Sequence, residues 1–152
     1  MNQIAELLPT DNIVLELDVD TKPRLFDRMG ELFEKNAGLA SATVSASLSA
    51  REKLGSTGLG QGIAIPHGRI KGLRKATAAF VRLRTPIAFD APDVKPVSQI
   101  FVLLVPEQAT EEHLQLLSEL AQMFSERTFR DKLAAARSAD ELAALFRAWE
   151  PA

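Results

Sequence analysis

Residues 100–105, with the sequence IFVLLV, place the strongest constraint on the fold of this chain. A strand with one buried face alternates apolar and polar residues, whereas an unbroken apolar run is typical of a strand buried on both faces. Such a strand lies inside a sheet that helices cover on both sides. We therefore expect an α/β fold in which residues 100–105 form a central strand.

Helix and strand patterns alternate through the rest of the chain. Strands are predicted at residues 13–17, 63–65, 77–84 and 98–105. Helices are predicted to begin after residues that are good N-caps: Thr21, Ser41 or Thr43, Thr110 and Ser138. Because no repeat or linker interrupts this alternation, we expect a single domain over residues 1–152, with a mixed sheet flanked by helices on both faces.

Two segments have more specific predictions. In residues 77–84, small and aliphatic side chains alternate with Phe80 and two arginines, which predicts a strand with only one buried face. Residues 86–96 contain three prolines and are expected to form an exposed, turn-rich excursion.

Composition and charge exclude several classes of function. The 18 basic and 20 acidic residues give a net charge of -2, so no overall field attracts nucleic acid or an anionic membrane. Cysteine is absent, which excludes disulfides and thiolate chemistry and is usual in cytoplasmic proteins. The chain shows neither a signal peptide nor an apolar window of about 18 residues. We therefore expect a cytoplasmic protein that inserts into no membrane.

The most distinctive motif is STGLGQGIAIPHG at residues 56–68. Its three glycines before residue 63 predict a loop that leads into a short strand, at whose end His67 stands between a proline and Gly68. A neutral imidazole is nucleophilic near neutral pH and can attack a phosphoryl group without a separate base. Glycine beside it allows backbone N–H groups to approach phosphate oxygens. These residues therefore indicate phosphoryl chemistry at His67.

Two other interpretations of the motif are weaker. Glycines of a nucleotide-binding loop follow a strand and open a helix, whereas these follow a predicted helix and precede a strand. The two histidines of the chain, His67 and His113, are 46 positions apart and no cysteine accompanies them, which is a poor ligand set for a metal. We expect neither a metal nor another cofactor.

The motif resembles the active-site signature of the enzyme IIA family of the phosphotransferase system, fructose/mannitol type, and the similarity extends from about Ile4 to about Trp149. Sugar-transporting members tend to carry an aromatic residue at the position of Gly58, whereas nitrogen-regulatory members carry glycine. The chain therefore resembles the nitrogen-regulatory branch. The resemblance implies the fold of that family and a phosphoryl group carried by His67 on its tele nitrogen, Nε2.

The resemblance also assigns roles to other residues. His113 matches the second active-site histidine and Arg51 the active-site arginine, while Ser56 and Thr57 match polar positions that support the phosphate loop. From spacing alone, Arg51 is expected to lean toward the interior at the end of a helix near the glycines. A cation in a last helical turn can equally serve to offset the helix dipole.

The resemblance implies an HPr-like phosphocarrier as donor, supplied from phosphoenolpyruvate, and a downstream regulatory protein as target. The 152 residues leave no room for an attached sugar-transport domain, which favours regulation. The alternative is a IIA component that passes phosphate to a IIB domain for sugar uptake. A basic run at residues 69–75, expected to be a solvated loop, could make docking sensitive to phosphate on His67. We expect a monomer or a weak dimer.

Overall fold

The computed structural model describes residues 2–108 and 111–151. Within them one six-stranded sheet has the order β1-β5-β6-β3-β2, with β4 also paired to β6. Its strands are β1 (Ile13–Leu17), β2 (Gly58–Gly60), β3 (Ile63–Ala64), β4 (His67–Ile70), β5 (Thr77–Ile87) and β6 (Val97–Pro106). Strands β3 and β4 run parallel to β6, and β1 runs parallel to β5, whereas β5 and β6 are antiparallel. The sheet is therefore mixed, as predicted.

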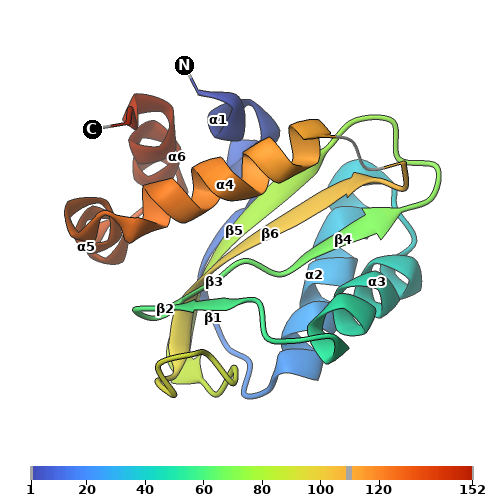
Figure 1. The fold of residues 1–152 in the computed structure, drawn as a ribbon, viewed down its shortest axis with the longest axis horizontal. Helices are drawn as coiled ribbons and strands as arrows, with labels where there is room; N and C mark the ends of the chain where they lie inside the picture. Colours follow the sequence, from blue (N-terminus) through green and yellow to red (C-terminus); the bar gives the residue numbers. More distant parts are fainter. Residues whose placement is uncertain (1, 109–110, 152) are drawn as a thin grey trace.

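Helices cover both faces of the sheet (Figure 1). They are α1 (Gln3–Leu7), α2 (Lys22–Ala37), α3 (Ser41–Lys53), α4 (Glu111–Ser125), α5 (Arg127–Ala135) and α6 (Ala139–Ala148), with a 3-10 turn at Thr10–Asn12. Helices α2 and α3 pack on one face, and α1, α4, α5 and α6 on the other, which gives two apolar cores. The predicted fold class is confirmed. None of the helices in the described part of the chain is long and apolar enough to cross a bilayer.

The apolar run in β6 occupies the interior of the sheet, as predicted. Each of its side chains is at most 6% exposed. Phe101, Leu103 and Val105 join the core under α4, while Ile100, Val102 and Leu104 join the core under α2 and α3. Strand β6 therefore contributes side chains to both cores. It also provides the backbone positions with which β3 and β4 pair.

The prediction of one buried face for residues 77–84 was wrong for the first half of the segment, whereas in the second half Arg82 is half-buried and Arg84 is exposed. Phe80 is fully buried and its ring packs edge-on against Phe146 of α6, with centroids 5.2 Å apart. The second face of β5 is covered because α6 lies on it, a contact that alternation within the strand could not reveal. The strand also continues through Pro86 to Ile87, and Phe89 in the expected excursion is fully buried.

Three of the predicted helix N-caps lie in the described residues, and two of them are confirmed. Thr21 and Ser138 accept hydrogen bonds from backbone N–H groups at the starts of α2 and α6. Helix α3 has no side-chain cap of its own, so the prediction of Ser41 or Thr43 as its cap was wrong. The carboxylate of Glu34, on α2, accepts the Ser41 N–H at 2.7 Å instead. Thr110 lies outside the described residues.

The glycine-rich stretch is more regular than predicted. Residues 58–60 form β2, which pairs with β3 as a hairpin across a turn at Gln61 and Gly62, both with positive φ. The basic run begins inside β4, whose Ile70 is 2% exposed, so the expectation of a loop was wrong for its first two residues. The four cations of the run are exposed: Arg69, Lys71, Arg74 and Lys75.

Candidate active site around His67

A cleft of about 840 Å³ lies where β4, the end of β6, α3 and the start of α4 meet. His67 is the first residue of β4 and stands opposite Leu103 of β6 in parallel register. Helix α3 packs against β4 on one side, and α4 begins shortly after β6 ends on the other. The cleft is lined by Ser47, Ala50, Arg51, Leu54, His67, Gly68, Arg69, Leu103, Val105, Glu111, His113, Leu114 and Leu117.

The structure places four of the residues singled out in the sequence around this cleft. Arg51 comes from the last turn of α3, His67 and Gly68 from β4, and His113 from the first turn of α4. Ser56 and Thr57 are not among its lining residues. They belong to the segment between α3 and β2.

The backbone orients the imidazole of His67. Its Nδ1 atom lies 2.9 Å from the carbonyl oxygen of Ile65, which can only accept a hydrogen bond. Nδ1 must therefore carry the proton in this contact. In the neutral ring the lone pair then belongs to Nε2, so Nε2 is the nucleophilic atom.

Burial lowers the pKa of His67 below its ordinary value, because the half-buried ring loses hydration of its charged form. The hydrogen bond to Ile65 works in the opposite direction. The positive charge of Arg51 lowers the pKa further, and the negative charge of Glu52 raises it. The net effect keeps the imidazole neutral, and hence nucleophilic, at neutral pH.

Gly68 allows α3 to approach β4 closely. A Cβ at this position would overlap the side chain of Ser47 and lie 3.4 Å from the Ser47 carbonyl carbon. Ser47 in turn donates from Oγ to the Arg69 carbonyl oxygen at 3.0 Å. The glycine therefore sets the distance between the helix that carries Arg51 and the strand that carries His67.

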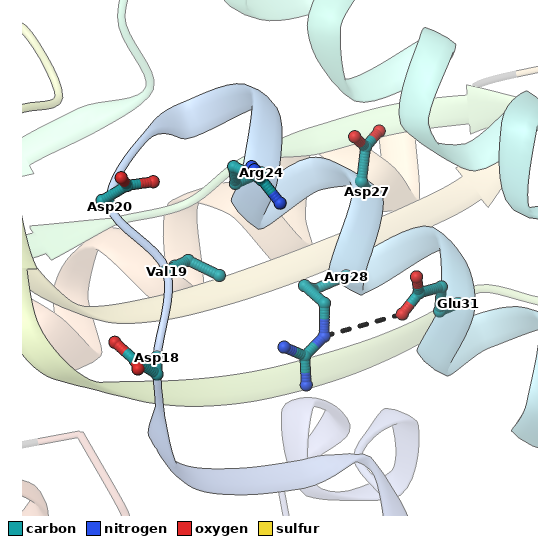
Figure 2. A pocket seen from close by; sticks show the side chains of 7 residues that line it. All are labelled: Asp18, Val19, Asp20, Arg24, Asp27, Arg28 and Glu31. Atoms are coloured by element: carbon teal, nitrogen blue, oxygen red, sulfur yellow. Dashed lines mark ion pairs between the residues drawn. The ribbon is translucent and has the colours of Figure 1, made fainter.

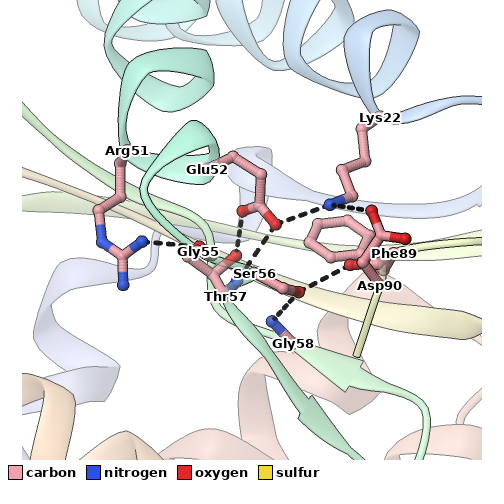
Figure 3. Close-up of polar contacts among 9 residues, drawn as sticks. All are labelled: Lys22, Arg51, Glu52, Gly55, Ser56, Thr57, Gly58, Phe89 and Asp90. Atoms are coloured by element: carbon pink, nitrogen blue, oxygen red, sulfur yellow. Dashed lines mark hydrogen bonds and ion pairs between the residues drawn. The ribbon is translucent and has the colours of Figure 1, made fainter. Parts of the chain in front are cut away.

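Arg51 and its neighbour Glu52 both reach the segment that follows α3 (Figure 3). Arg51 donates from Nη1 to the Gly55 carbonyl oxygen at 2.8 Å. Glu52 accepts from both the N–H and the hydroxyl of Thr57, at 3.1 and 2.6 Å, and from Lys22 Nζ at 2.9 Å. Sequence reasoning missed Glu52. The available signal was a carboxylate beside Arg51 and five residues before a threonine in the motif.

The cleft has apolar rims. Leu54, just after α3, is 85% exposed, and Leu114 of α4 is 68% exposed. Two exposed leucines, one from each neighbouring helical segment, therefore flank the polar side chains of the cleft.

A second depression, shown in Figure 2, lies between the end of β1 and α2 and has a volume of about 390 Å³. It is lined by Asp18, Val19, Asp20, Arg24, Asp27, Arg28 and Glu31. Its drawn ion pair, Arg28 to Glu31 at 3.6 Å, joins side chains that are 49% and 67% exposed. Such a pair is a solvated surface feature. Within residues 2–108 and 111–151, no cluster of three histidine, aspartate or glutamate side chains could hold a metal ion.

Comparisons with known proteins show the family to which the chain belongs. Residues 6–149 match the family described as "Phosphoenolpyruvate-dependent sugar phosphotransferase system, EIIA 2". A nitrogen regulatory protein of Klebsiella oxytoca is 41% identical over 141 residues, which cover 92% of this chain and 87% of that protein. A nitrogen regulatory protein of Pseudomonas aeruginosa is 41% identical over 93% of both chains.

Solved structures give the same result. The crystal structure of nitrogen regulatory protein IIA-Ntr from Neisseria meningitidis is 55% identical with a TM-score of 0.90, covering 95% of this chain and 99% of that one. The mannitol IIA of Escherichia coli is 25% identical with a TM-score of 0.76, covering 90% of this chain and 96% of that one. The chain therefore belongs to the EIIA 2 family of the phosphotransferase system, in which it groups with the nitrogen regulatory proteins.

Proposed function

We propose that this protein accepts a phosphoryl group on Nε2 of His67 from an HPr-like phosphocarrier charged from phosphoenolpyruvate. Its phosphorylation state then acts as a signal to a downstream regulatory protein. The observation that carries the proposal is the contact of 2.9 Å between His67 Nδ1 and the Ile65 carbonyl oxygen, in a histidine that lines an open cleft. This contact makes Nε2 the nucleophile without any side-chain base.

The transfer needs no proton movement at His67. The Nε2 lone pair attacks phosphorus, the Nε2–P bond forms as the donor N–P bond breaks, and the donor nitrogen keeps the electron pair of the broken bond. The Nδ1 proton stays on the ring, where the Ile65 carbonyl oxygen accepts it. The site therefore contributes mainly position and electrostatics, which are what phosphoryl transfer requires.

In this proposal Arg51 and His113 contact the phosphoryl group, and Arg51 supplies a positive charge. A guanidinium can hold two phosphoryl oxygens in a bidentate contact, and Arg51 lines the same cleft as His67. For that contact Arg51 exchanges the Gly55 carbonyl oxygen for the phosphoryl group. His113 lines the opposite side, at the start of α4, and contacts the phosphoryl group from there.

The surroundings of the cleft support regulation through phosphorylation. A phosphoryl group adds about two negative charges. These charges arise beside exposed leucines at the rim and next to Arg69, the first cation of the basic run. A partner that docks on this rim therefore meets a different potential in the two states.

One observation favours a second candidate function. A protein named the fructose-specific EIIA component of Haloferax volcanii is 36% identical over 91% of this chain. The second candidate function is that this protein passes its phosphoryl group on to a IIB domain for sugar uptake. Transfer to fructose- and mannitol-type IIB domains separates the two candidates, because the regulatory proposal expects no rapid onward transfer.

Intact-protein mass spectrometry tests the central proposal. Incubation with the upstream phosphocarriers and phosphoenolpyruvate should add one acid-labile, base-stable phosphoryl group to the wild type and none to His67→Ala. A stable mass gain in His67→Ala would contradict the assignment. A pull-down with wild type, phosphorylated wild type and His67→Ala tests the signalling step, since the partner should distinguish the phosphorylated form from the other two.

A further inference from the structure

We infer that Glu52 is a positioning residue for phosphoryl transfer. It fixes the segment between α3 and β2, and through that segment it holds the backbone that orients His67. This inference rests on the proposed function for its effect on transfer rate, and it stands on contacts that the family comparison does not assign.

The Glu52 carboxylate accepts three hydrogen bonds, from Thr57 and Lys22, and this group of three side chains is called the hub below. The Glu52 side chain is 7% exposed. Oε1 accepts from the Thr57 hydroxyl at 2.6 Å, and Oε2 accepts from the Thr57 N–H at 3.1 Å and from Lys22 Nζ at 2.9 Å. A buried carboxylate with both oxygens used is held in one position, because any other position would leave it unpaired.

Lys22 of the hub is also held by contacts with other residues. Its side chain is 16% exposed, and its Nζ lies 4.6 Å from the centroid of the Phe89 ring and 3.3 Å from Asp90 Oδ2 (Figure 3). Lys22 is the first residue of α2, so the hub joins the start of α2 to the end of α3. The charge on Glu52 is therefore matched by a cation from a different element.

A continuous set of hydrogen bonds runs from this hub to the imidazole. Glu52 holds Thr57, whose carbonyl oxygen accepts the Ile65 N–H at 3.0 Å. The Ile65 carbonyl oxygen then accepts from His67 Nδ1 at 2.9 Å. Because Ile65 is held through its N–H and orients His67 through its carbonyl, a shift of Thr57 is transmitted to the ring.

The same segment is held from two other sides. Arg51 donates to Gly55, and Ser56 donates from Oγ to the Phe89 carbonyl oxygen at 2.7 Å. When Arg51 leaves Gly55 for a phosphoryl group, the hub at Glu52 keeps the segment in place. The nucleophile then stays aligned while the guanidinium moves.

The test compares Glu52→Gln and Thr57→Val with Asp90→Asn in the full chain. Glu52→Gln keeps the shape of the side chain but removes its charge, and Thr57→Val removes one hydroxyl from the hub. Asp90→Asn is the matched control, because it removes the other carboxylate near Lys22 without touching Thr57. The rate of phosphorylation is measured against phosphocarrier concentration, and the tautomer of His67 is measured by ¹⁵N NMR of the imidazole.

Glu52→Gln should lower kcat about tenfold or more with KM for the phosphocarrier nearly unchanged, since the loss is of alignment. The Nε2–H tautomer of His67 should become measurable in Glu52→Gln and Thr57→Val, and Asp90→Asn should match the wild type in both measurements. Wild-type kcat and tautomer in both hub variants would overturn the inference. If Glu52→Gln does not fold, Thr57→Val carries the test. If the wild type itself takes up no phosphoryl group, the proposed function fails, and the tautomer measurement still decides the role of the hub.

Discussion

The Nη1 atom of Arg51 lies 2.8 Å from the carbonyl oxygen of Gly55, four residues later in the chain. This contact gives the guanidinium a backbone acceptor at the edge of the cleft, on the helix next to the nucleophile. The arginine therefore has a defined position in the cleft, and in the proposed transfer it exchanges this acceptor for a phosphoryl oxygen.

Arg51→Lys should slow phosphorylation of His67 by about tenfold to a hundredfold, because an ammonium cannot make the bidentate contact of a guanidinium. Rapid-quench measurement of phosphoprotein formation gives the rate. Lys53→Ala is the matched control, since it removes an exposed cation two residues away on the same helix and should leave the rate unchanged. Equal rates for Arg51→Lys and the wild type would remove Arg51 from the site.

His113→Gln should slow the same transfer by about tenfold or more while leaving the fold intact, because His113 lines the cleft from the first turn of α4. Circular dichroism and thermal unfolding accompany the kinetics. Lost secondary structure in this variant would mean that His113 is structural, and a wild-type rate would mean that one histidine suffices for the reaction.

Local patterns were enough to predict the architecture, because the apolar run in β6 and the caps at Thr21 and Ser138 depend on neighbouring residues. The errors came from contacts between different helices and strands, which the pattern within one element does not reveal. Glu34 caps α3 from α2, seven residues earlier in the chain. Phe80 is buried because α6 covers it from the other end of the sequence.

The candidate site was likewise predicted in part from the sequence. The motif and its family resemblance pointed to His67, Arg51 and His113, whose grouping around one cleft depends on the parallel pairing of β4 with β6. Glu52 stands beside Arg51 and five residues before Thr57 in the sequence, but its contacts depend on Lys22 from another helix and on the path of the segment after α3. Residue type alone makes Glu52 look like an ordinary surface carboxylate.

The stability of the protein should depend on the protonation of His67. Its pKa in the folded protein is lowered from 6.5, so the unfolded chain binds a proton here at higher pH than the folded chain does. Relative to His67→Gln, the wild type should therefore lose stability as pH falls below 6.5, and the loss should be complete below the folded pKa. Urea unfolding of both proteins between about pH 8 and pH 5 measures the difference. A constant difference, or one that grows in favour of the wild type in acid, would contradict the lowered pKa.

Gly68→Ala should destabilise the fold by about 1–3 kcal/mol, because the new methyl group would overlap the side chain of Ser47 and force α3 away from β4. Ser47→Gly in the same chain should recover part of this loss, since it removes the atoms that the methyl group meets. A double-mutant cycle measured by urea unfolding gives the coupling between the two positions, which should be favourable and at least about 0.5 kcal/mol. The displaced helix also carries Arg51, so Gly68→Ala should slow phosphorylation and Ser47→Gly should partly restore it. Independent effects at the two positions would show that the spacing between helix and strand is set elsewhere.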